Sequence, residues 1–366
     1  MTANVRATFL SLLLGVASPL FGGVNAWTNN GPVALVTALA VDPGSGAVYV
    51  ATPGRIYKSA DHGASWTPIG PDFDPQRYIT ALAVDPTDAS TIYAGIEQDG
   101  GVVKSSDGGA TFAPSRNGLP AYPGAAEIVI DPKNPSTIYL EGNYLYRSED
   151  AGSNWTFLSF PGTADSLAVD PNVPNRVLAG SFRSPHGGVW VSEDAGQNWH
   201  AVANPGNTGS PDSNLIFDTS HPGRMYGTFG TTVARSDDGG ETWERGDASF
   251  GNSGTRLAVD SASGGIVYAT DAGQCIVGTG GPPCVNDLSG VYRSDDQGQT
   301  WTRLGDQAIS GASTVAVDPT GQFVYASSLR SNGVSVFEYP WPSRLPIQPP
   351  ARRTRTTLGR PEPQNR

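Results

Sequence analysis

An eight-residue box occurs six times along the chain and constrains its fold more than any other feature. Each copy reads Ser-x-Asp-x-Gly-x-x-Trp or a close variant and follows a short apolar run; the copies span 59–66, 105–112, 148–155, 192–199, 236–243 and 294–301. Their aspartates are separated by 46, 43, 44, 44 and 58 residues. A four-stranded blade of a β-propeller takes about 40–50 residues. The repeat therefore predicts an all-β propeller with one box in each of six blades.

A second signature, an apolar pair followed by Asp-Pro or a relative of it, precedes each box and occurs once more near the end. Its aspartates are Asp42, Asp85, Asp131, Asp170, Asp218, Asp260 and Asp318. Proline cannot donate to a strand ladder, and aspartate can cap a turn, so each copy is typical of an inner strand that ends in a turn. Two more strands follow before the box, which forms a hairpin into the outer strand. Seven signatures predict seven blades.

The seventh unit has three apolar runs but no box. Trp27-Thr28 copies the Trp-Thr at Trp66, Trp155 and Trp301, where the last residue of the box is expected to open the outer strand. If this segment supplies the missing outer strand beside residues 333–339, it closes the ring and protects both free edges. We therefore predict an N-terminal outer strand in the last blade.

Both ends of the chain differ from the repeats. Residues 1–26 combine Arg6, an apolar stretch at 7–24 and small residues at Val24 and Ala26, a pattern typical of a secretory signal peptide. Residues 341–366 are rich in proline and arginine, which predicts a disordered tail. The propeller is expected over 27–340. We expect an exported protein, periplasmic or secreted, with no membrane span after signal removal.

The predicted ring is acidic. Without residues 1–26 and 341–366, the chain has 16 basic and 33 acidic residues, a net charge of −17. Such a surface disfavours nucleic acid and anionic membranes. We expect a monomer that binds a protein or a glycan.

The chain has two cysteines, Cys275 and Cys284, inside the one overlong repeat. In an exported protein this pair predicts a disulfide that stabilises the loop. A closed zinc site needs four ligands, and no histidine lies near the pair in sequence. We therefore expect no metal and no cofactor.

The box residues suit a structural role. An aspartate can accept backbone N–H groups in the hairpin, glycine adopts backbone conformations that are costly for other residues, and Trp buries a large ring between sheets. We interpret six aspartates as determinants of the fold: Asp61, Asp107, Asp150, Asp194, Asp238 and Asp296.

These boxes are similar to the Asp-box, or bacterial neuraminidase, repeats, and the chain resembles Asp-box β-propellers over 27–340. This group includes sialidases, xyloglucan-cleaving glycoside hydrolases, sortilin ectodomains and photosystem II assembly factors. The Arg-Ile-Pro motif of sialidases is matched only by Arg55-Ile56-Tyr57, which lacks the proline. The xyloglucan-cleaving enzymes join two propellers, whereas one is expected here. A single exported ring most resembles the assembly factors, which act as binding scaffolds.

A functional site is expected on the face opposite the boxes, because its loops vary freely. The catalytic candidates are Asp72, Asp74, Glu97, Asp99 and His186, and the binding candidates are Arg77, Tyr78, Tyr122, Arg183 and Arg330. Further ionisable residues of the same loops are Glu127, Glu141, Tyr144, Asp212, Arg245, Asp247, Asp271 and Asp287.

The leading interpretation is a non-enzymatic scaffold that presents this face to a protein or glycan. The alternative is a carbohydrate-active hydrolase or lyase. Glycosidic cleavage needs two carboxylates about 5–10 Å apart, and many pairs among these loops could satisfy that requirement. An enzyme should gather several acids in one pocket, with an arginine or a tyrosine, whereas a scaffold should show a broad face.

Overall fold

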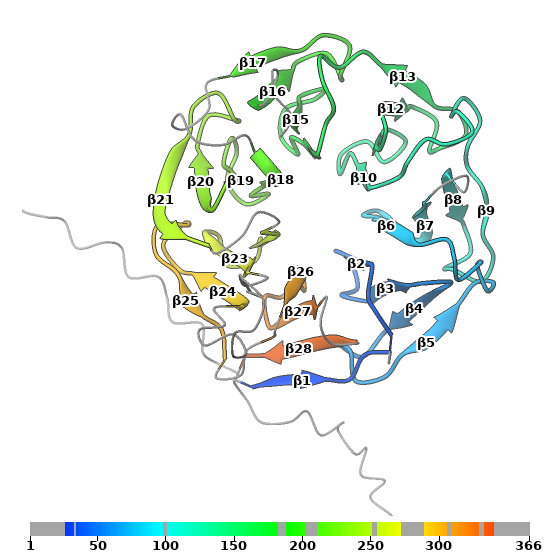
Figure 1. The fold of residues 1–366 in the computed structure, drawn as a ribbon, viewed down its shortest axis with the longest axis horizontal. Coiled ribbons are helices and arrows are strands. Elements are labelled where there is room, and N and C mark those ends of the chain that lie inside the picture. The colour runs from blue at the N-terminus through cyan, green and yellow to red at the C-terminus, as the bar shows by residue number, and fades with distance from the viewer. Residues whose placement is uncertain are drawn as a thin grey trace, which may run out of the picture.

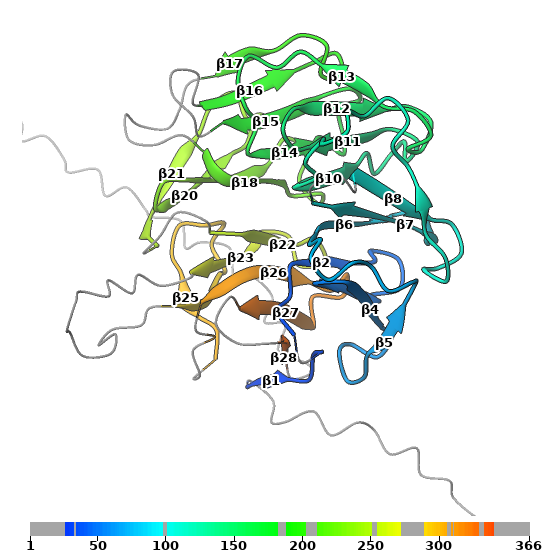
Figure 2. The ribbon, with the colours of Figure 1, turned by 45° about the vertical axis from the view of Figure 1, so that its right-hand side comes forward.

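A computed structural model of the chain describes residues 26–32, 34–97, 101–181, 188–202, 211–250, 255–271, 289–305, 309, 311–328 and 333–339, without the side chains of 211–213 and 247–249. These residues form seven four-stranded sheets arranged as blades around one axis (Figure 1). Figure 2 shows the blades in oblique view. The predicted all-β, seven-bladed propeller is confirmed. The predicted signal peptide, apart from Ala26, and the predicted tail lie outside the described residues.

Each blade is an antiparallel meander that runs from the axis to the rim. The inner strands are β2 (Ala38–Val41), β6 (Ile79–Asp85), β10 (Glu127–Ile130), β14 (Ser166–Val169), β18 (Pro211–Phe217), β22 (Leu257–Asp260) and β26 (Ala312–Val317). The second strands are β3 (Val48–Thr52), β7 (Asp88–Ile96), β11 (Ile138–Glu141), β15 (Val177–Ser181), β19 (Met225–Phe229), β23 (Ile266–Asp271) and β27 (Phe323–Ser328).

The third strands are β4 (Arg55–Ser59), β8 (Gly101–Ser105), β12 (Leu145–Ser148), β16 (Gly188–Ser192), β20 (Thr232–Ser236), β24 (Gly290–Ser294) and β28 (Val334–Glu338). The outer strands are β5 (Thr67–Ile69), β9 (Ala113–Pro114), β13 (Thr156–Leu158), β17 (His200–Val202), β21 (Glu244–Ser249), β25 (Thr302–Arg303) and β1 (Trp27–Asn29). Below, the blades are numbered 1 to 7 in the order of their inner strands. In the six blades that have a box, the outer strand begins after the last residue of the box. Where that last residue is Trp66, Trp155 or Trp301, the strand was predicted to begin at the tryptophan and begins one residue later.

The N-terminal strand closes the ring as predicted. In Figure 1, β1 lies along β28 at the rim of blade 7, and Trp27 pairs with Phe337 in the antiparallel register. The indole Nε1 of Trp27 donates to the Leu304 carbonyl of blade 6 at 2.8 Å. Its ring also packs against the Phe337 ring, with 5.3 Å between centroids. One residue therefore joins the chain start to blades 6 and 7.

The box of blade 3 shows how the hairpin is held. The Asp150 carboxylate accepts hydrogen bonds from the Ser148 hydroxyl, from the Asn154 backbone N–H and from the Asn154 side chain, at 2.7–2.9 Å. The Gly152 N–H donates to the Ser148 hydroxyl at 2.8 Å. All six boxes share the Ser-to-Asp and Gly-to-Ser bonds and the backbone bond to the carboxylate. These bonds satisfy the polar groups of the turn within the box itself.

The box turns of blades 3 to 6 are also hydrogen-bonded to the preceding blade. Ala151, which follows the box aspartate, has a φ of 54°, in the left-handed region. Its carbonyl accepts from the Tyr93 hydroxyl and from the Lys104 ammonium of blade 2, both at 2.9 Å. We call the interface between two neighbouring blades a seam. In the seam between blades 3 and 4, Arg147 of blade 3 donates to the Ala195 carbonyl at 2.7 Å. The box thus fastens one blade to the next.

The hydrophobic core lies between the blades. The second strands of six blades contribute a tyrosine at most 2% exposed: Tyr49, Tyr93, Tyr139, Tyr226, Tyr268 and Tyr325. Aliphatic side chains of neighbouring blades surround them; Tyr139 of blade 3, for example, packs with Leu167 and Val177 of blade 4. Among the described residues, no helix is long and apolar enough to span a membrane.

Loss of the Trp27 contacts is expected to open the ring. We expect Trp27→Ala to lower the free energy of unfolding by about 2–3 kcal/mol, because it removes a partly buried ring and a hydrogen bond. Trp27→Phe keeps a ring and loses the bond to Leu304, so it should cost about 1 kcal/mol. Urea denaturation measures both values. Equal midpoints for Trp27→Ala and the wild type would contradict closure by β1.

The box carboxylates should make the protein sensitive to acid. Hydrogen bonds from the Thr111 hydroxyl, the Thr111 N–H and the Ser105 hydroxyl lower the pKa of Asp107 to about 2. A lowered pKa in the folded state contributes stability that is present above the ordinary value of 3.8 and is lost as the pH falls toward 2. Asp107→Asn cannot titrate. Its urea midpoint should therefore lie below that of the wild type at neutral pH and approach it in acid, and a gap that does not change with pH would argue against this role.

Candidate functional site on the loop face

The antiparallel meander gives the ring two different faces. The box hairpins and the Asp-Pro turns share one face, here called the box face. The outer-to-inner loops and the turns between second and third strands share the other, the loop face. Box-turn carbonyls such as that of Ala151 are already bonded to the preceding blade, so a binding site is expected on the loop face.

Two of the catalytic candidates form exposed ion pairs in the loop between blades 1 and 2. Asp72 contacts Arg55 at 2.6 Å, and Asp74 contacts Arg77 at 3.6 Å. Each of these side chains is at least 40% exposed. Glu97, at the end of β7, joins this loop through its backbone N–H, which donates to the Tyr78 carbonyl at 2.8 Å. The structure therefore brings these candidates near one another on an open rim, where exposed pairs contribute little to stability.

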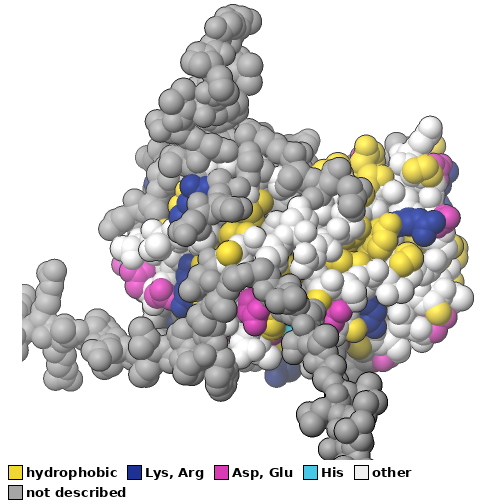
Figure 3. All heavy atoms as spheres, turned by 90° about the horizontal axis from the view of Figure 1, so that it is seen from below, with side chains coloured by type: hydrophobic (Ala, Val, Ile, Leu, Met, Phe, Trp, Pro, Cys, Tyr) yellow, Lys and Arg dark blue, Asp and Glu magenta, His cyan; other side chains and the backbone are white. Residues whose placement is uncertain are grey.

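Exposed aromatic side chains gather on blades 1 to 3. Tyr78, Tyr122, Tyr144 and Phe157 are 41–65% exposed, and we call them the tyrosine face. The Asn143 amide donates to the Tyr122 carbonyl at 2.8 Å and so holds the Tyr122 loop beside the turn of Tyr144. Tyr144 meets Phe157 edge-on, with centroids 5.7 Å apart. In Figure 3, which looks at the rim from the side of β1 and β28, hydrophobic side chains gather on the right, where blades 1 and 2 lie.

Two glutamates face each other across the first two strands of blade 3, on the side that faces blade 4. Glu127 begins β10, Glu141 ends β11, and the two are direct partners in the register, which places their Cβ atoms about 4.5–5.5 Å apart. The Glu127 carboxylate accepts the Leu167 N–H of blade 4 at 2.9 Å. Asn214 makes the equivalent bond to Leu257 at 2.8 Å between blades 5 and 6. Glu127 therefore also joins two blades.

Glu141 is held differently from Glu127. Glu141 is 6% exposed. Within the described residues, no hydrogen bond is made to its carboxyl group. Burial, together with the charges of Glu127 and Asp165, raises the pKa of Glu141 to about 8, although Arg256 of blade 6 opposes the shift. Burial also raises the pKa of Glu127, against Arg256 and the Leu167 N–H. At neutral pH the pair therefore holds a proton.

Several predicted residues lie outside the described part of the chain: Asp99, Arg183, His186, Arg330, Asp287 and the cysteines Cys275 and Cys284. The side chains of Asp212 and Asp247 are not described either. The predicted disulfide stays a prediction.

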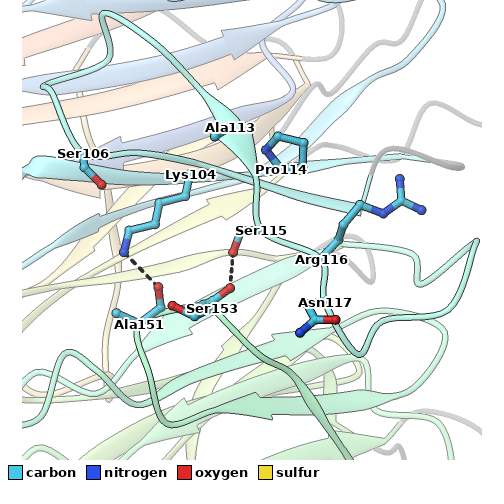
Figure 4. A pocket seen from close by; sticks show the side chains of 10 residues that line it. Lys104, Ser106, Ala113, Pro114, Ser115, Arg116, Asn117, Ala151 and Ser153 are labelled. Atoms are coloured by element: carbon cyan, nitrogen blue, oxygen red, sulfur yellow. Dashed lines mark hydrogen bonds between the residues drawn. The ribbon is translucent and has the colours of Figure 1, made fainter.

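A cavity of about 440 Å³ opens on the other side of the ring, between blades 2 and 3. Figure 4 shows the Lys104 ammonium directed to the Ala151 carbonyl, and the Ser115 hydroxyl bonded to the Gly152 carbonyl at 2.6 Å. Both donors are thus used within the seam that fastens the box. Within the described residues, no group of three or more His, Cys, Asp and Glu side chains is placed to hold a metal ion.

Sequence reasoning noted Glu127 and Glu141 separately but missed their pairing, and it missed Asp165 and Arg256. An available signal was the position four residues before the aspartate of each Asp-Pro signature. Across the seven blades this position holds Ala38, Ala81, Glu127, Ser166, Asn214, Arg256 and Thr314. Equivalent positions of a propeller surround the axis, so this alignment would have placed Glu127 and Arg256 on one ring.

The buried acid should make the protein less stable in mildly alkaline solution. Because the folded-state pKa of Glu141 is raised from 4.5 to about 8, the wild type should lose stability as the pH rises from about 4.5 to about 8, with no further loss above that. Glu141→Gln cannot ionise, so its free energy of unfolding at pH 9 should exceed that of the wild type by about 2–4 kcal/mol. Thermal unfolding between pH 5 and pH 9 measures this. Parallel curves for the two proteins would contradict the raised pKa.

Comparisons with known proteins agree with this architecture. The BNR/Asp-box repeat model matches residues 234–245 and 292–303. No curated protein matches the sequence. Among solved structures, a GH74 enzyme of Niastella koreensis has 19% identity and a TM-score of 0.64, covering 84% of this chain and 53% of its own. The chain thus spans about half the length of the GH74 enzymes that it matches.

Two further structures share the fold. YCF48 bound to D1 peptide has 16% identity and a TM-score of 0.59, with 87% of this chain and 96% of the other covered. A chain of the mitotic checkpoint complex has 14% identity and a TM-score of 0.64, with 92% and 100% covered. Such low identities show the fold alone. This chain is therefore a seven-bladed β-propeller in which two of the boxes match the BNR/Asp-box repeat.

Proposed function

We propose that this protein is a binding scaffold that presents the loop face of blades 1 to 3 to a protein or glycan partner. The observation that carries the proposal is the tyrosine face. In the part of the chain that the structure describes, five large hydrophobic side chains are exposed, and four of them belong to it. The fifth, Val173, lies in the turn between β14 and β15 on the box face. Tyrosine is enriched at recognition surfaces because its ring provides contact area and its hydroxyl a hydrogen bond.

The two faces of the ring differ in a way that supports this proposal. On the box face, polar groups are engaged in the hydrogen bonds that hold the hairpins and the seams. On the loop face, the side chains of Tyr122 and Tyr144 are 65% and 59% exposed. Their backbone positions are fixed, since Asn143 also donates its N–H to the Pro123 carbonyl at 2.8 Å. A rigid, exposed aromatic surface costs little conformational entropy on binding. YCF48, which shares the fold, is seen bound to a D1 peptide.

Carbohydrate cleavage is the second candidate, because some propellers of this fold are GH74 enzymes. The acids expected for it lie on an open rim, where Asp72 and Asp74 are engaged in exposed ion pairs. The paired acids Glu127 and Glu141 are closer together, but Glu141 is nearly inaccessible and Glu127 is bonded to a neighbouring blade. This arrangement favours binding over hydrolysis.

The cellular setting belongs to the same proposal. Residues 1–26 have the pattern of a signal peptide, so we place the protein in the periplasm or outside the cell, with Cys275 and Cys284 joined there and the ring acting as a monomer. The net charge of −17 between the two ends favours a partner with a basic surface, since complementary charge speeds association.

Substitutions on the tyrosine face should abolish recognition without unfolding the ring. We expect Tyr122→Ala and Tyr144→Ala to weaken any ligand found on peptide and glycan arrays by about tenfold or more. Val173→Ala removes an exposed side chain from the box face and should leave the affinity unchanged. Fluorescence anisotropy measures these affinities. Undiminished binding by both tyrosine variants would contradict the proposal, and turnover of an array glycan would favour the hydrolase.

A further inference from the structure

The tyrosine face continues from blade 3 across the seam to blade 2. Phe157 pairs with Tyr146 across the strands and meets its ring edge-on, with centroids 6.0 Å apart. Tyr146 packs in the core shared with blade 2, so Phe157 and its contact Tyr144 lie on the side of blade 3 that faces blade 2. The loop of Tyr122 runs from blade 2 to blade 3 and is held beside the Tyr144 turn by the Asn143 amide. Three exposed rings therefore belong to one stretch of the rim.

Tyr78 extends this surface toward blade 1. Its carbonyl accepts the Glu97 N–H at the end of β7 at 2.8 Å. At the start of β8, a Cβ added to Gly101 would lie 3.5 Å from the Cγ of Pro123, the residue after Tyr122. The loops of Tyr78 and Tyr122 therefore flank the same turn of blade 2. The tyrosine face thus follows the rim, a shape that suits an extended ligand.

The face also offers hydrogen-bond donors. Within the described residues, the exposed hydroxyls of Tyr122 and Tyr144 make no hydrogen bond. The Asn143 amide uses one N–H on the Tyr122 carbonyl and has a second. A polyproline II segment has no internal hydrogen bonds, and its prolines have carbonyls but no N–H groups. The face therefore supplies rings for the prolines of such a segment and donors for its free carbonyls.

A carboxylate without an ion-pair partner lies at the Tyr78 end of the face. The Glu97 side chain is exposed and forms no ion pair with the described residues, whereas Asp72 and Asp74 are paired. No Lys, Arg, Asp, Glu or His occurs in the segments that carry the other three rings, 117–126, 142–146 and 153–164. A ligand with an uncharged middle and a cation at one end complements this pattern.

We propose that the tyrosine face binds an extended, proline-rich peptide segment of a partner protein, with a lysine or arginine of that segment against Glu97. This inference rests on the proposed function, of which it names the partner class. The rings of Tyr122 and Tyr144 stack on prolines, as in other aromatic-lined surfaces that recognise polyproline II. Because this helix is preformed, the segment loses little conformational entropy on binding. A neutral glycan offers no cation to Glu97, and an acidic glycan is repelled by it.

The test is fluorescence anisotropy of the full chain with a labelled hexaproline peptide flanked by arginines, called the arginine probe. We expect saturable binding at pH 7, weakened about tenfold or more in Tyr122→Ala and in Tyr144→Ala. Tyr144→Phe keeps the ring and should weaken binding less than Tyr144→Ala does. A glycine–serine peptide of the same length and charge does not form polyproline II in advance and should bind about tenfold more weakly. Cellohexaose serves as the neutral glycan probe and should not displace the arginine probe.

Glu97→Lys is the decisive variant, because it reverses the charge that selects the ligand. It should weaken the arginine probe about fivefold and should bind hexaproline flanked by glutamates more tightly than the wild type does. Glu149→Lys makes the same change in a side chain that is 72% exposed on the box face, and it should leave both affinities unchanged.

Three results would overturn the inference: no binding of the arginine probe by the wild type, equal binding of the glycine–serine peptide, or an unchanged preference in Glu97→Lys. Displacement of an array ligand by cellohexaose but not by the arginine probe would assign the face to a glycan instead. If Tyr122→Ala and Tyr144→Ala lose an array ligand while the arginine probe does not bind, the proline-rich partner is wrong and the tyrosine face stands.

Discussion

The ring depends on bonds between the turn of a box and the blade before it, which the structure shows from blades 2 and 3 round to blades 5 and 6. The aspartate and serine of the box hold the turn so that the residue after the aspartate adopts a left-handed conformation, and its carbonyl points out of the hairpin. In blade 3 this carbonyl belongs to Ala151, and Tyr93 and Lys104 of blade 2 both donate to it. A four-stranded blade cannot bury both of its apolar faces alone, so such seams turn seven weak units into one core.

This contact also explains the division between the two faces. On the box face, carbonyls, hydroxyls and cations are consumed in joining blades, and even the cavity between blades 2 and 3 is lined by donors already in use. On the loop face the connections are freer to differ, and there the exposed tyrosines and the buried acid pair occur. Glu127 shows that the division is not complete, since it both joins blades 3 and 4 and raises the pKa of its neighbour Glu141.

Sequence alone predicts the parts of the fold that repeat. Box spacing indicates blades, the seventh Asp-Pro signature indicates one more, and Trp27 indicates how the ring closes, because each is a local pattern with one structural solution. The seams vary more. Blade 4 has Leu178 and Val191 where five other blades pair a tyrosine with a lysine or an arginine. In blade 4, Arg176 forms the contact to the next blade instead, reaching Glu241 at 2.8 Å. That replacement comes from another part of the chain and has no local signature.

The site was less predictable for the same reason. Glu127 and Arg256 are far apart in sequence and become neighbours only around the axis, and the exposure of Tyr144 depends on how its turn packs. The unusual carboxyl of Glu141 results from burial, which composition does not show. The most direct measurement of this account is a carbon-detected NMR titration of the Glu141 carboxyl in the unliganded protein. A midpoint near 8 is the result that the account predicts, and a midpoint near the ordinary 4.5 would contradict it.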